Sequence, residues 1–152
     1  MTTPEFDSPD AASADEAMAQ WPNGRLLSTA ARLVEHAWVE ALASLGLTHA
    51  GLIVLHLLGP GARSQTELAR EARVQTQTMS RTLDRLEREG LIARIRDERD
   101  ARRHLVTRTD AGTAAWRQAR TLEADVFPPL DNADELRAAL LQIIAASSAR
   151  RW

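Results

Sequence analysis

The chain has 152 residues, a length that suits one domain with a proper core and is short for two independent domains. It contains no cysteine, which excludes disulfides, thiolate metal sites and thiol-based peroxide sensing. No apolar run approaches the roughly 20 residues that cross a bilayer, and the N-terminal residues do not resemble a secretory signal. We therefore expect a cytoplasmic protein without membrane contact.

The formal net charge of −2 conceals an uneven distribution. Residues 62–108 carry 12 arginines and 8 acids, a net charge of +4, whereas the rest of the chain carries 7 arginines and 13 acids. The densest stretch is RIRDERDARRHLVTRTDAG, residues 94–112, with six arginines. A basic segment in an otherwise acidic chain predicts a local, shaped contact with a polyanion.

The N-terminal part predicts a tail followed by two helices. Residues 1–18 are rich in Pro, Ser, Asp and Ala and predict a flexible acidic tail. Apolar residues recur at helical spacing over residues 25–45, which predicts an amphipathic helix that Gly46 can end. Thr48 can cap a second helix, whose sequence AGLIVLHLLGPG predicts deep burial.

Two shorter helices are predicted next. The sequence SQTE at residues 64–67 is a capping-box pattern, so a short helix is expected from there to about Ala72. A second helix is predicted from about Thr76 to a stop at Gly90. Its apolar face is formed by Met79, Leu83 and Leu86.

The periodicity changes after Gly90. LIARIR and HLVTRT are short runs rich in β-branched residues, and they predict a two-stranded hairpin closed by the charged turn DERDARR. Asp110 can cap a further helix, which Pro128 and Pro129 end. A last amphipathic helix is predicted over residues 133–146.

A helix pair followed by a hairpin predicts a winged helix-turn-helix, in a fold that is mainly α with a small β-hairpin. The second helix has a polar outer face of Gln, Thr, Ser and Arg, which suits base reading in the major groove of DNA. Arg102 on the hairpin tip suits a minor groove, and Asp100 can brace the tip. Arg85 can reach a phosphate. The predicted DNA contacts are Ser64, Gln75, Thr76, Gln77, Thr78, Ser80, Arg81, Arg85, Arg94, Arg96, Arg99, Asp100 and Arg102.

The sequence TELAREARVQTQTMSRTLDRLEREGLIARIRDERDARRHLVTRTDAG resembles the MarR family of bacterial transcription regulators. The family pattern of an aspartate, an arginine and a helix-opening threonine is matched by Asp100, Arg102 and Thr109. Two positions depart from it, since Arg108 replaces a usual leucine and Glu98 replaces a frequent proline. The substitution at Arg108 leaves the packing of the second wing strand open.

The resemblance implies three regions: residues 62–109 as the DNA-binding lobe, and residues 19–61 and 110–152 as helical segments that form a dimerisation region. It therefore implies a homodimer on a pseudo-palindromic duplex operator, and we expect a repressor. Amphipathic terminal helices that lack a partner for their apolar faces favour the same assembly.

The resemblance also implies a small aromatic or phenolic effector, for which Trp38, His49, His56 and Arg63 are the predicted ligand contacts. A metal-responsive regulator stays an alternative because His49 and His56 share a helix, although no tight cluster predicts a metal site. A winged-helix module that binds protein and not DNA is a second alternative. No catalytic constellation or cofactor motif stands out, so we expect neither an enzyme nor a bound cofactor.

Overall fold

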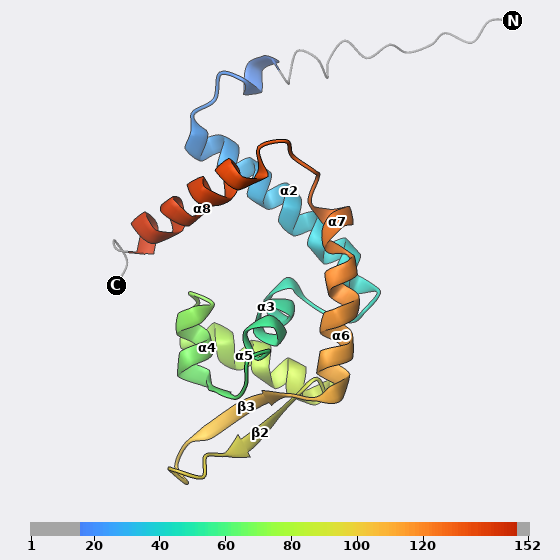
Figure 1. The fold of residues 1–152 in the computed structure, drawn as a ribbon, viewed down its shortest axis with the longest axis vertical. Coiled ribbons are helices and arrows are strands. Elements are labelled where there is room, and N and C mark those ends of the chain that lie inside the picture. The colour runs from blue at the N-terminus through green and yellow to red at the C-terminus, as the bar shows by residue number, and fades with distance from the viewer. Residues whose placement is uncertain (1–15, 149–152) are drawn as a thin grey trace, which may run out of the picture. The chain divides into compact units, whose positions relative to one another are not determined.

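In the computed structural model, the described residues are 16–148, and the chain divides into two units, Met1–His49 and Ala50–Trp152. Each unit is described by itself (Figure 1). Most of the predicted tail, residues 1–15, lies outside the described residues, and residues 16–18 are helical. Within the described part of the chain, no helix is both long and apolar enough to cross a membrane.

The first unit is dominated by α2 (Asn23–Ala43), within two residues of the predicted helix. Trp38 and Leu42 are buried on one face of it. Gly46 adopts φ +66°, which is favourable for glycine, and so lets the chain reverse. The amide of Leu47 then donates to the Leu42 carbonyl at 3.2 Å, which satisfies one of the last carbonyls of the helix.

The second unit contains the predicted helix pair. The helix pair follows α3 (His49–Leu57), in which Gly51, Val54 and Leu55 are buried. The pair itself is α4 (Gln65–Glu71) and α5 (Thr76–Arg88), and α5 buries Met79, Leu83 and Leu86 as predicted. Gly90 takes φ +74° just after α5, which confirms it as the stop.

The predicted hairpin is part of a three-stranded antiparallel sheet, so the expectation of two strands was incomplete. The strands β2 (Ile92–Arg96) and β3 (His104–Arg108) pair with Ile92 opposite Arg108 and Arg96 opposite His104. The added strand β1 (Arg63–Ser64) pairs with β3, so the order is β1-β3-β2. Two residues are too few to show strand periodicity, which is why the sequence did not reveal β1.

Helix α6 spans Asp110–Thr121. Its N-cap lies one residue before Asp110, the cap that the sequence predicted. Thr109 and not Asp110 is the N-cap, because the β3 ladder carries the chain to Thr109 in an extended conformation and its Oγ1 accepts the Gly112 amide at 3.0 Å. Asp110 lies in the first turn, where a carboxylate is favoured by the helix dipole. The family pattern of a helix-opening threonine is confirmed.

The rest of the chain forms α7 (Glu123–Val126) and α8 (Ala133–Ser148). The helix predicted to run through Val126 is interrupted at Leu122, which ends α6. Helix α8 has no buried residue, and its apolar side chains are exposed at Leu141, Ile143 and Ile144.

Gly112 is a point at which the fold requires glycine. A Cβ there would lie 2.0 Å from the backbone carbonyl oxygen of Leu91. We expect Gly112→Ala to lower the free energy of unfolding by about 2 to 3 kcal/mol, because a backbone atom cannot move aside as a side chain end can. Gly24→Ala is the matched control, since a Cβ at that helical glycine meets nothing within 4 Å. Chemical denaturation measures both, and equal stabilities would contradict the assignment.

Candidate nucleic-acid interface

The outer face of α5 is polar along its first two turns. Gln75, Thr76, Gln77, Thr78 and Arg81 are exposed, and Ser80 is half-buried. Gln75 occupies the N-cap position, but its side chain makes no capping hydrogen bond. The side-chain carboxamide of Gln75 is therefore not used to begin the helix. No acid lies between Gln75 and Arg81, and the side chains that α5 buries lie on the opposite face. This face can donate to and accept from base edges.

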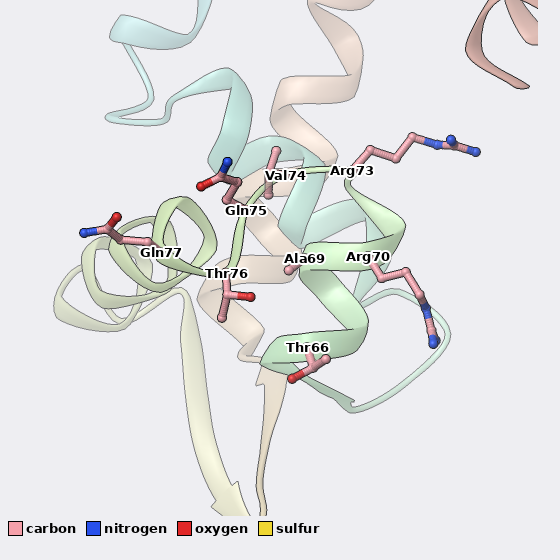
Figure 2. Close-up of a pocket in the computed structure, with 8 residues that line it drawn as sticks. All are labelled: Thr66, Ala69, Arg70, Arg73, Val74, Gln75, Thr76 and Gln77. Carbon is pink, nitrogen blue, oxygen red and sulfur yellow. The ribbon is translucent and has the colours of Figure 1, made fainter. Parts of the chain in front are cut away.

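A cavity of about 630 Å³ lies beside that face, between α4 and the start of α5. Figure 2 shows Gln75, Thr76 and Gln77 on one side of it and α4 on the other. Helix α4 and the turn after it contribute Thr66, Arg70 and Arg73 to the lining. The predicted DNA contacts did not include these three residues. Their spacing of four and three residues, which is that of one helix face, could have placed them on the same side of α4.

The hairpin β2–β3 extends away from α3, α4 and α5 (Figure 1). Its tip is held by acids that accept backbone amides. Asp97 Oδ1 accepts from the Arg99 amide at 2.9 Å, and Asp100 Oδ1 accepts from the Arg102 amide at 3.0 Å. Asp100 therefore braces the tip through the Arg102 backbone, and Arg102 itself is exposed.

Some predicted contact residues are engaged within the lobe. The Arg94 guanidinium donates to Asp84 Oδ1 at 2.7 Å and also to Glu87. The hydrogen bond to Asp84 raises the pKa of Arg94 above its ordinary value. Arg85 pairs with Glu89 at 3.1 Å along α5. These arrangements separate Arg94 from the wing arginines at 96, 99 and 102, which are exposed.

Ser64 is buried, with 8% of its surface exposed, and it forms the predicted capping box. Its Oγ accepts the Glu67 amide at 3.2 Å, and its own amide donates to Glu67 Oε2 at 2.7 Å. Hydrogen bonds from the backbone and the side chain of Ser64 lower the pKa of Glu67, with a smaller effect from the nearby Arg103 guanidinium. The role of Ser64 in this structure is to begin α4.

Comparison with known proteins agrees with this geometry. Residues 45–103 match the sequence model of the MarR family. The structure also superimposes on the repressor CouR bound to a 23-mer DNA duplex, with 32% identity, a TM-score of 0.71, and coverage of 84% of this chain and 92% of that one.

The chain belongs to the MarR family.

Two further relatives are informative. A MarR variant from E. coli complexed with operator DNA has 25% identity and a TM-score of 0.71, over 79% of this chain and 91% of that one. The transcriptional activatory protein BadR of Rhodopseudomonas palustris is 33% identical over 90 residues, which cover 57% of this chain. That match spans about half the length of BadR, 51%. The predicted family and fold class are confirmed, and the family consists of regulators and not of enzymes.

The predicted effector contacts fall in two groups, one in each unit. In the first unit, the His49 ring stacks on Trp38 with centroids 5.5 Å apart, and His49 Nδ1 lies 2.5 Å from Glu35 Oε2. In the second unit, the His56 ring lies tilted against Trp116 at 6.1 Å. Arg63 lies in β1, where its Nε is 3.6 Å from Glu71. Among residues 16–148, no group of three His, Asp or Glu side chains could hold a metal ion.

Arg108 is where this chain departs from the family leucine, and its guanidinium is half-buried. Its Nη1 donates to the Leu55 carbonyl in the last turn of α3 at 2.9 Å. The same guanidinium lies 4.7 Å from the centroid of the Trp116 ring, which Arg120 also approaches at 5.1 Å. The second wing strand is therefore packed at this position through cation–π contact and a hydrogen bond, in place of an apolar side chain.

Proposed function

We propose that this chain is a transcription regulator that binds a duplex DNA operator. One observation carries the proposal: an acid-free polar face on α5 and a braced, arginine-bearing wing tip belong to the same lobe. A polar helix face suits the major groove, where base edges carry a distinguishable pattern, and a wing arginine suits the narrow, electronegative minor groove. The DNA complexes of CouR and of E. coli MarR support it by likeness of fold and sequence.

The roles within the lobe follow from exposure. Arg81 and the glutamines at 75 and 77 read bases, and Arg102 enters a minor groove, while Arg96 and Arg99 neutralise phosphates. Arg70 and Arg73, which line the cavity beside α5, join them as phosphate contacts. Ser64 and Arg94 are left out of the DNA-contacting set, because the first is buried in a cap and the second is held by two carboxylates.

We propose a homodimer that acts as a repressor. Helix α8 exposes Leu141, Ile143 and Ile144, and α2 exposes Leu33 and Val39, so both helices offer apolar surface that a second copy can cover. Two recognition helices related by a twofold axis require half-sites about one helical turn apart. A dimer seated over a promoter excludes polymerase, which is the physical basis for repression.

Selection from a random duplex library tests DNA binding and dimerisation together. The full chain should enrich an inverted repeat whose half-site centres lie about 10 base pairs apart, because each protomer presents one α5. Affinity for that duplex should fall steeply between about 50 and 200 mM salt as counterion release weakens. Enrichment of no duplex would refute DNA binding, and a single unrepeated site would refute the dimer.

Arginine substitutions test the division of labour. Arg102→Ala should weaken operator binding about tenfold without lowering the melting temperature, through loss of the minor-groove contact. Arg81→Ala should cost about 1 to 3 kcal/mol of discrimination at particular base pairs. Arg32 on α2 is also exposed, so Arg32→Ala is the control. It should change neither the operator affinity nor the discrimination between base pairs. Anisotropy titrations on matched and mismatched duplexes measure these effects. A loss that is uniform over all sequences for Arg81→Ala would reassign it to a phosphate.

We further propose that a small aromatic or phenolic molecule lowers operator affinity. Ring pairs at Trp38 and His49 and at His56 and Trp116 offer stacking surfaces, and Arg63 and Arg108 offer positive charge. A ligand that binds better to a conformation unsuited to DNA shifts the population toward it.

A thermal-shift screen of aromatic acids and divalent cations tests the effector. The expected hit raises the melting temperature by several degrees, as binding to the folded state requires, and weakens operator binding. His56→Ala should reduce both effects, whereas His36→Ala, an exposed histidine of α2, should leave them unchanged. Stabilisation by cations alone would replace this proposal with the metal-responsive one.

A further inference from the structure

Arg94 differs from the other wing arginines in what surrounds it. It is the third residue of β2 and lies opposite Val106 in the ladder, well below the tip. Its side chain is 26% exposed, whereas Arg96 and Arg102 are exposed. The residue thus belongs to the base of the wing.

Two carboxylates of α5 hold the Arg94 guanidinium at once. Nη2 pairs with Asp84 Oδ1 at 2.7 Å, and Nη1 pairs with Glu87 Oε2. Asp84 and Glu87 are three residues apart, so they lie on one side of the helix and present their oxygens to one planar fork. Within residues 16–148, these are the ion pairs that join the wing to the recognition helix.

Backbone contacts tie the base of the wing to α5, where the Leu91 amide donates to the Leu86 carbonyl at 2.9 Å. Only residues 89–91 separate α5 from β2, and Gly90 within them has φ +74°, a conformation with few steric limits for glycine. Beyond Leu91, the ladder hydrogen bonds of β2 are made to β3, so they stiffen the wing and leave its direction relative to α5 to side-chain contacts. The Arg94 guanidinium, which bridges two carboxylates of α5, supplies that constraint.

The same contact changes the charge that DNA meets. Asp84 and Glu87 are the acids in the second half of α5 next to the basic face, and unpaired they would repel phosphates. Arg94 neutralises this pair locally. Its charge is constant at any working pH, because Asp84 and Glu87 hold its pKa above an already high value.

We propose that Arg94 is a positioning residue, which fixes the wing to α5 through Asp84 and Glu87 so that Arg102 and the helix face enter neighbouring grooves together. This inference rests on the proposed function. It assigns Arg94 no direct contact with DNA.

The decisive variants are Arg94→Ala, its control Arg96→Ala, and the charge swap R94D/D84R. Both alanine substitutions remove one positive charge from the same strand, and only the first releases the wing. Arg94→Ala should weaken operator binding about tenfold and lose minor-groove protection in a hydroxyl-radical footprint, because the released wing no longer holds Arg102 in its groove. Arg96→Ala should lower the salt slope by about one and keep the footprint. The swap has the wild-type net charge and should restore affinity and footprint.

A measurement without DNA accompanies these. Hydrogen exchange of the Leu91 amide, which donates to the Leu86 carbonyl where the wing meets α5, should be about tenfold faster in Arg94→Ala than in wild type, and should return to the wild-type rate in R94D/D84R. Unchanged exchange and affinity in Arg94→Ala would overturn the inference. So would a reduced salt slope that the swap fails to restore, since that is the behaviour of a phosphate contact. If wild type selects no duplex, the proposed function itself fails and this inference falls with it, an outcome distinct from normal selection with an inert Arg94.

Discussion

The carbonyl of Leu91 is the point on which the DNA-binding lobe depends. It accepts the Thr109 amide at 3.1 Å, and it lies where a side chain at Gly112 would have to be. Thr109 Oγ1 donates to the Gly90 carbonyl at 2.7 Å and accepts from the Gly112 amide. The end of α5, both strands of the wing and the start of α6 are therefore joined within one small junction. Any rotation of the wing or of α6 begins from this fixed base.

Acids in this lobe are used internally, which explains how an acidic protein presents a basic face. Seven of the eight acids between residues 62 and 108 contact a donor within the lobe. The donors are arginines for Glu71, Asp84, Glu87 and Glu89, backbone amides for Asp97 and Asp100, and both kinds for Glu67. These carboxylates are paired within the lobe, whereas the arginines at 81, 96, 99 and 102 are exposed. The sequence pI of about 6.1 consequently says little about the potential at the wing and α5.

Local patterns were sufficient to predict most elements of this fold. Capping chemistry located α4, and helical periodicity located α5 and its buried face, because these signals act within a few residues. Strand pairing between distant residues could not be predicted from the sequence. Strand β1 forms because β3 lies beside it, and Thr109 is the N-cap of α6 because the β3 ladder ends just before it. The same limit applied to Arg94, which looked like one basic residue among six until the fold brought Asp84 and Glu87 beside it.

Arg108 illustrates how a departure from a family pattern can be absorbed by the fold. A leucine at the end of β3 would be stabilised by burial alone, whereas the arginine replaces this with a hydrogen bond to a carbonyl at the end of α3 and with a ring contact to Trp116. Each such contact contributes about 1 kcal/mol, comparable to part of a buried aliphatic side chain. The carbonyls at a helix C-terminus carry partial negative charge, so a guanidinium is favoured there. The substitution therefore exchanges a nondirectional contact for a directional one that ties α3, the wing and α6 to a single side chain.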